Sequence, residues 1–425
     1  MVRLDRITPP LLRRYRERQL MPVIVEARAN MFQSLRDALR EIVPIAEFQA
    51  FRRPLWRLFS LPETPLAKWK EMETFGMIAT VLTPNLIEEV SQWRSVKAIY
   101  QDRVMYAIGQ ASTSWFTTPL NEYRTLELDQ ADLEGYRGSG VKVAVIDTGT
   151  RLTHESFIGA KLKILTAMPE KGGAGLDTSG HGTFVSSTII GRRLYVHQYN
   201  ANVGGVAPEA EVVSIQALGF VVGAGFESDT LQALEMSLKE GCHIVNMSLG
   251  AKDPPPDEFN PSAKAISQLS EKGMVIVCAA GNNGPDEGTI NSPGSARDAF
   301  TVGAFSSYDG TVPDFSCRGP SPNGEVKPDV VAPGVNILSA CVGVLDTLED
   351  PKVRGYAILS GTSMACPMAA GLLARVKQLF DVNGIPFNIY TVKEACSLSG
   401  GVKDNEKGWG LIRWSWFKEY VETKR

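Results

Sequence analysis

The chain has 425 residues, of which 44% are hydrophobic and 21% are charged, and its formal net charge is −3. This length favours a main domain of roughly 300 residues with a smaller second one, and the composition is typical of a folded protein rather than a disordered one. Charges of both signs are scattered along the chain, which excludes a strongly basic field, so we expect no nucleic-acid partner.

The ends and the cysteines carry little sign of targeting or cross-linking. Residues 1–20 are basic, and their apolar pair Leu11 and Leu12 is far too short for the core of a signal peptide. No apolar run is long enough to cross a membrane, so we expect a cytoplasmic protein with no membrane partner. The six cysteines lie far apart without a CxxC pair, which predicts reduced, buried thiols: Cys242, Cys278, Cys317, Cys341, Cys366 and Cys396.

The first part of the chain has the pattern of a small α+β domain. After an N-terminal extension over 1–21, residues 22–108 alternate strand and helix signals in the order β-α-β-β-α-β of the ferredoxin-like type. Thr83 and the following proline mark the start of the second helix. The predicted segments are strands over 22–29, 75–82 and 96–106, and helices over 32–42 and after Thr83.

A polar, turn-prone linker over 109–121 separates this domain from a larger one over 122–425. In the larger domain short apolar runs alternate with helices, which is typical of a parallel sheet buried on both faces. The sequence therefore predicts a doubly wound α/β fold with ligands at the carboxyl ends of its strands. Strands are predicted over 141–146, 211–215, 243–247 and 274–278, and helices over 183–190, 228–239, 262–271 and 362–380.

Two polar residues stand near the first of these strand ends. Asp147 directly follows the strand predicted over 141–146, so its carboxylate lies at the rim of the sheet. His181 lies between Gly180 and Gly182 at the start of a helix, where small neighbours leave both ring nitrogens accessible. Taken singly, a turn aspartate and a structural histidine are the commoner roles of such residues.

Two more polar residues follow later in the chain. Ser363 lies in the first turn of the apolar helix over 362–380, where a serine can be a simple cap or an uncrowded hydroxyl near the positive end of the helix dipole. Asn282 follows a predicted strand and a run of small residues. A carboxamide there can donate to an oxyanion, although turn asparagines usually bond their own backbone.

Taken together, these four motifs resemble the subtilisin-like serine proteases, over residues 123–414 and in the order that the family shows. The resemblance implies that Asp147 orients the imidazole of His181, which acts as general base and then acid. It also implies that Ser363 is the nucleophile, and that Asn282 with the Ser363 backbone N–H holds the oxyanion. A serine endopeptidase acting through an acyl-enzyme is therefore expected, and it requires no cofactor.

The resemblance extends to a substrate cleft and so implies a protein or peptide substrate. One matching segment pairs with an extended substrate backbone, and two others line the primary pocket. Acidic residues in the loop over 251–260 suggest basic peptides. The matching residues are Gly223, Ala224 and Gly225 at the edge, with Ser248, Leu249 and Gly250 opposite Ala279, Ala280 and Gly281 in the pocket.

The first domain is similar to the inhibitory propeptide of the same family, most clearly over 83–107. This similarity implies an intramolecular inhibitor whose tail after Ala107 occupies the cleft until it is cut between about Met105 and Leu120. A stable accessory module is the alternative for this domain. The chain would then be a zymogen that processes itself.

The chain departs from the family at its common calcium site. The aspartate nine positions after the catalytic one is replaced by Ser156, and the loop over 192–202 is built differently, so we do not expect that site. Solvated loops are the simpler interpretation of two acidic clusters that calcium might otherwise occupy. These clusters are Asp253, Asp257 and Glu258, and Asp346, Glu349 and Asp350.

Two other functions compete with an active peptidase. One is a catalytically silent protein that keeps the fold and binds peptides through the segments at 223–225 and 248–250. The other is an ester or amide hydrolase of the α/β-hydrolase type, against which the absence of a G-x-S-x-G turn speaks.

Overall fold

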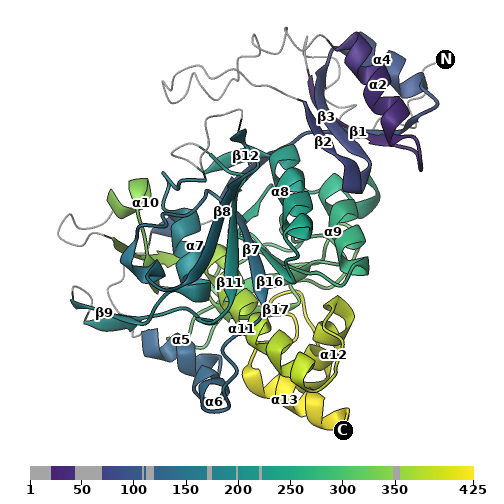
Figure 1. Cartoon of the computed structure of the whole chain (residues 1–425). Helices are drawn as coiled ribbons and strands as arrows, with labels where there is room; N and C mark the ends of the chain where they lie inside the picture. The colour runs from purple at the N-terminus through teal and green to yellow at the C-terminus, as the bar shows by residue number, and fades with distance from the viewer. Residues whose placement is uncertain are drawn as a thin grey trace.

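The computed structural model describes residues 21–43, 69–107, 110–111, 119–169, 175–197, 200–219, 223–347 and 355–425. A small N-terminal unit lies at one end of the molecule, and the C-terminal helices lie at the other, across the larger unit (Figure 1). Within these ranges no helix is both long enough and apolar enough to span a bilayer. The predicted N-terminal extension, apart from Met21, lies outside the described residues.

The N-terminal unit is a four-stranded antiparallel sheet covered by two helices. Its strand order is β2-β3-β1-β4, which follows from the predicted ferredoxin-like chain order. The hydroxyl of Thr83 accepts the backbone N–H of Leu86 and so caps the second helix as its sequence predicts. The elements are β1 (Met21–Ala27), α2 (Phe32–Ile42), β2 (Lys70–Met72), β3 (Met77–Leu82), α4 (Pro84–Gln92) and β4 (Val96–Gln101).

The strand predicted over 96–106 was wrong as a single element. It is divided into β4 (Val96–Gln101), which stays in the N-terminal sheet, and β5 (Val104–Ala107), which joins the larger unit. Between them, Asp102 and Arg103 leave the sheet because their side chains bind the first turn of helix α8 (Glu227–Lys239). The apolar pattern continues through the point where the chain passes from one sheet to the other, so the sequence carries no signal of this break.

The larger unit is built on a seven-stranded sheet of order β17-β16-β15-β13-β7-β11-β8, in which every pairing is parallel. The predicted doubly wound α/β fold is confirmed, although three of the strands were not predicted. The strands are β7 (Lys142–Asp147), β8 (Lys161–Thr166), β11 (Glu211–Gln216), β13 (Ile244–Met247), β15 (Val275–Ala279), β16 (Phe300–Phe305) and β17 (Val330–Pro333).

Helices cover both faces of this sheet and divide its core in two. On one face Val143 and Val145 of β7 pack with helices α7 (His181–Ile190) and α11 (Thr362–Val382). On the other face Ala144 and Ile146 pack with α8 and α9 (Pro261–Glu271). Successive side chains of a strand point to opposite faces, so a continuous apolar run is what a sheet covered on both sides requires.

The N-terminal sheet rests on the same side as α8 and α9 (Figure 1). Its strands present two faces: Val23 and Val25 pack under the N-terminal unit's own helices, while Ile24 joins the core that contains α8 and α9. Met77 and Ala79 of β3 join that second core as well. The two units therefore share a continuous apolar interface rather than a flexible tether.

The remaining elements surround the sheet and its carboxyl edge. Helix α5 begins inside the stretch predicted as a linker over 109–121. These elements are β6 (Gln110–Ala111), α5 (Pro119–Thr125), α6 (Leu128–Leu133), β9 (Leu194–Val196), β10 (Ala201–Val203), β12 (Ala224–Phe226), β14 (Leu249–Gly250), β18 (Ile337–Ala340), α10 (Gly343–Thr347), β19 (Tyr356–Ser360), α12 (Ile389–Ser399) and α13 (Trp414–Thr423), with short 3₁₀ turns η3 (Glu73–Phe75), η4 (Glu155–Phe157) and η7 (Asp257–Phe259).

Candidate active site

Asp147 and His181 meet at the carboxyl edge of the sheet. Asp147 is the last residue of β7, is fully buried, and its Oδ1 lies 2.8 Å from Nδ1 of His181. His181 is the first residue of α7 and follows Gly180, whose φ of 104° and close approach to the Val342 carbonyl leave no room for a Cβ. A carboxylate bonded to Nδ1 holds the ring with Nε2 directed away from it, the orientation a general base needs.

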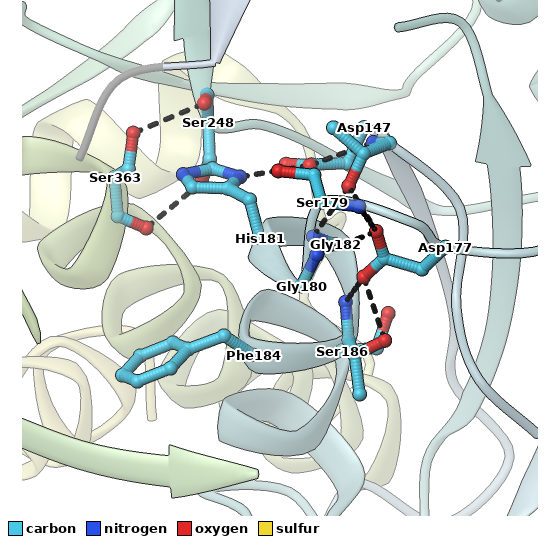
Figure 2. A network of polar contacts seen from close by, with 12 residues as sticks. Asp147, Asp177, Ser179, Gly180, His181, Gly182, Phe184, Ser186, Ser248 and Ser363 are labelled. Atoms are coloured by element: carbon cyan, nitrogen blue, oxygen red, sulfur yellow. Dashed lines mark hydrogen bonds and ion pairs between the residues drawn. The ribbon is translucent and has the colours of Figure 1, made fainter. Parts of the chain in front are cut away.

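Asp177 holds the Asp147–His181 pair in place through hydrogen bonds to residues next to each of them. Its two oxygens accept hydrogen bonds from the Thr148 hydroxyl (2.9 Å), from the backbone N–H groups of Ser179 (3.0 Å) and Gly180 (2.8 Å), and from the N–H (2.8 Å) and hydroxyl (2.7 Å) of Thr183. It therefore ties the turn after Asp147 to the first turn of α7 (Figure 2). Burial raises the pKa of Asp177, while these donors oppose that rise.

Sequence reasoning missed Asp177. It stands four positions before His181 in a polar run, and nothing in the sequence distinguishes it from an ordinary turn aspartate. Four of its five donors lie within six residues of it in the turn that leads into α7, and only the Thr148 hydroxyl comes from a separate segment. A fully buried carboxylate with so many donors is a positioning group rather than a group open to substrate.

Ser363 lies beside the histidine, in the first turn of α11. Its hydroxyl donates to the backbone carbonyl of Ser248 at 3.0 Å, and the Ser248 hydroxyl donates to the Ser363 carbonyl at 3.0 Å. The imidazole of His181 lies between the Asp147 carboxylate and Ser363 (Figure 2). For its proton to reach the imidazole, the Ser363 hydroxyl must give up the Ser248 carbonyl, and catalytic hydrogen bonds of this kind often form only when substrate is bound.

Asn282 presents a free amide donor next to the serine. Its Oδ1 accepts both the backbone N–H and the hydroxyl of Thr362, each at 2.8 Å. Because an N–H can bond only to the amide oxygen, these contacts fix which end of the carboxamide is Nδ2. Among the residues that the structure describes, this buried Nδ2 has no hydrogen-bond partner. A buried donor without a partner is costly, and such a group is what an oxyanion hole presents.

The predicted substrate cleft contains a strand of the chain itself. Strand β5 lies between β12 and β14 and pairs antiparallel with both. The N–H of Ala107 donates to the carbonyl of Gly223 at 2.8 Å, and Tyr106 stands opposite both Ala224 and Gly250. The segments predicted to bind substrate, at 223–225 and 248–250, are thus brought together around an extended backbone.

A second short strand from the same part of the chain lies next to the segment that leads into Ser363. Strand β6 (Gln110–Ala111) pairs with β19, opposite Leu359 and Ser360, which lead directly into Ser363. The tail after Ala107 that was expected to occupy the cleft lies mostly outside the described residues, so that expectation stays a prediction; Gln110 and Ala111 are the described part of it. The predicted pocket residues Ala279 and Ala280 are fully buried, and Gly281 donates to the Thr362 hydroxyl at 3.1 Å.

The cysteines and acidic clusters take no part in this site. All six cysteines are buried and free, and burial holds the pKa of the Cys366 thiol well above its ordinary value. In the described ranges, no group of three or more His, Cys, Asp or Glu side chains is arranged to hold a metal ion. Glu349 and Asp350 of the second acidic cluster lie outside the described residues.

The chain is similar to several known serine proteases. The serine protease AprX of Bacillus subtilis is 35% identical over 57% of this chain, and this chain spans 58% of AprX. M-protease of Shouchella clausii is 32% identical over 72% of this chain and 70% of its own length. The solved structure of the prenylagaramide maturation protease PagA covers 69% of this chain and 98% of its own, at 26% identity and a TM-score of 0.54. Residues 138–410 match the subtilase family, so this chain belongs to the subtilase family of serine endopeptidases.

Proposed function

We propose that this chain hydrolyses peptide bonds with Asp147, His181 and Ser363, and that it is made as a zymogen which its own N-terminal domain inhibits. The observation that carries the proposal is strand β5, which lies in the cleft as an extended peptide and leads toward the serine. The family implies a peptide substrate, and the segment that occupies the cleft is itself an extended peptide.

Each catalytic role has a group in position. His181 takes the proton of Ser363 as its oxygen bonds to the substrate carbonyl carbon, and Asp147 stabilises the imidazolium that forms. The oxyanion accepts from Asn282 Nδ2 and from the Ser363 backbone N–H. His181 then gives its proton to the leaving amine as the C–N bond breaks. In the second step His181 takes a proton from water as the water oxygen bonds to the acyl carbon, and it returns that proton to the Ser363 oxygen as the ester bond breaks. Groups of the chain fill every role, so we propose that no cofactor is required.

The same geometry supports self-processing. Ala107 pairs with Leu249, next to Ser248, and Gln110 pairs with Ser360, three positions before Ser363; only three peptide bonds separate Ala107 from Gln110. We propose that the first cut falls on one of these three bonds, within the wider range that the sequence indicated. The product would leave β5 in the cleft as an inhibitor with main-chain hydrogen bonds to β12 and β14.

Intact mass over time tests both parts. Wild type should lose a fragment that ends between residues 107 and 109, while Ser363→Ala should stay whole because it lacks the nucleophile. A fluorophosphonate should label wild type after processing and leave Ser363→Ala unlabelled. Ser397→Ala, an exposed serine on α12, is the matched control and should behave as wild type. Cleavage of Ser363→Ala at the same bond, or processed wild type that binds peptides without hydrolysing them, would overturn the proposal.

A further inference from the structure

Arg103 makes a buried contact with the larger unit just before β5. Its side chain is 12% exposed, and its Nε and Nη2 each lie 2.9 Å from an oxygen of Glu227, whose side chain is fully buried. This is the two-pronged pairing of guanidinium and carboxylate, which fixes geometry as well as charge. Glu227 is the first residue of α8 and belongs to the larger unit.

The pocket around this contact is already built from buried polar side chains. Nη2 of Arg103 also donates to the Ser292 hydroxyl at 3.0 Å and lies 3.5 Å from the amide oxygen of Asn260. The Ser262 hydroxyl donates to Glu227 at 2.6 Å, which holds the carboxylate in place. Asn260, Ser262 and Ser292 are fully buried, and all lie after the proposed processing site, so the whole pocket stays with the processed enzyme.

The backbone of Arg103 is bound in the way that the backbone of a peptide substrate would be. Its carbonyl accepts the N–H of Glu227 at 2.8 Å, and the next residue, Val104, pairs with Phe226 at the end of β12. A substrate that adopts the pairing of β5 would therefore present its residue four positions before the Ala107 equivalent to the same pocket.

Departure of the N-terminal domain would leave Glu227 without its counter-charge. Glu227 is fully buried while Arg103 covers it, so a peptide that takes the place of Arg103 would bury this carboxylate again, and a buried carboxylate needs a matched cation. An arginine from another peptide would restore both hydrogen bonds. Lysine presents a point charge that cannot make the two-pronged contact, and a neutral side chain leaves the carboxylate without a cation.

We propose that Glu227, Asn260 and Ser292 form an arginine subsite of the processed enzyme, which reads the residue four positions before the one that matches Ala107. Arg103 is its intramolecular occupant. The subsite rests on the proposed peptidase function and adds a preference for substrates that carry arginine well upstream of the bond that is cut.

Paired fluorogenic peptides test the subsite on enzyme processed from the full chain. Both peptides carry the sequence of residues 102–111, one with arginine at the Arg103 position and one with citrulline, its neutral isostere. Wild type should cleave the arginine peptide with a kcat/KM about ten- to a hundredfold higher, the range expected for hydrogen bonds to a charged group. Glu227→Gln should lose this preference by slowing on the arginine peptide alone.

Glu235→Gln is the matched control, because it removes a carboxylate from the same helix away from the pocket, and it should keep the preference. Equal cleavage of both peptides by wild type, or an undiminished preference in Glu227→Gln, would overturn the subsite. If wild type cleaves neither peptide, the proposed function fails instead. In that case the affinities of the two labelled peptides for the same sample, measured by fluorescence anisotropy, still decide whether the pocket prefers arginine.

Discussion

At the scale of single residues, the four polar residues singled out from the sequence lie together in the structure. Each stands at or shortly after the end of a strand, or at the start of a helix, and in a parallel sheet those ends share one edge. The residues that orient them could not be predicted: Asp177 bonds mainly its own turn and resembles an ordinary turn aspartate, whereas the partner of Thr362 is remote along the chain. Thr362 bonds Asn282 across 80 positions. A side chain whose role depends on such distant partners shows no local pattern.

Thr362 gives the first prediction, as a positioning residue for the oxyanion donor. Thr362→Val keeps the shape and the backbone N–H but removes the hydroxyl that bonds Asn282. Loss of one neutral hydrogen bond should lower kcat about tenfold with little change in KM. Loss of the whole donor lowers turnover about 10²–10³-fold in subtilisin itself, which sets the upper limit. Thr362→Ser should restore most of kcat, whereas a change in KM alone would show that Thr362 acts on binding instead.

At the scale of elements, helix α8 supplies only part of its own N-terminal cap: the carboxylate of Asp229 accepts the backbone N–H of Phe226 at 2.7 Å. Its N-cap residue is Phe226, which offers no side-chain oxygen. The N-terminal unit supplies the other part of the cap: Asp102 accepts the Ser228 N–H at 3.0 Å and the Ser228 hydroxyl at 2.8 Å. The helix itself was predicted from its apolar pattern. The cap that Asp102 provides could not be predicted, because no sequence rule pairs an aspartate with a helix 126 positions later.

The cap that Asp102 provides for helix α8 should slow the release of the N-terminal unit. A helix N-cap contributes about 1 kcal/mol, so Asp102→Ala should bring on peptidase activity about fivefold faster after processing of the full chain. The measurement is the lag before hydrolysis of a fluorogenic peptide. Asp37→Ala, which removes an exposed carboxylate of α2, is the control and should keep the wild-type lag. An unchanged lag in Asp102→Ala would mean that the cap does not limit release.

At the scale of the whole molecule, the sequence predicted both units and the class of each fold. Continuous apolar runs indicated strands buried on both faces, which the two cores on either side of the sheet explain. The edge strand β8, in which lysines alternate with apolar residues, gave no such signal. The sequence also gave no indication that β5 would change partners, because pairing across two units depends on tertiary contacts rather than on local preference.

Glu122 on α5 makes the stability of the whole molecule depend on pH. Its carboxylate is buried, one of its oxygens has no hydrogen-bond partner among the described residues, and burial raises its pKa to about 7 from an ordinary 4.5. Between pH 4.5 and pH 7 this carboxyl is therefore mostly protonated in the folded chain and mostly ionised in the unfolded chain. The contribution of this carboxyl to the free energy of unfolding is therefore fully present below pH 4.5, and it is lost as the pH rises through 7.

Glu122→Gln removes this titration while keeping the shape of the side chain. At pH 8 the variant should be more stable to unfolding by about 3 kcal/mol, and at pH 4.5 the two proteins should differ little. Urea unfolding in the Ser363→Ala background, which removes the proposed nucleophile and with it self-digestion, measures the difference at both pH values. Asp129→Asn, an exposed carboxylate on the adjoining helix α6, should change neither value. An equal gain from Glu122→Gln at both pH values would show that packing, rather than the buried charge, separates the two proteins.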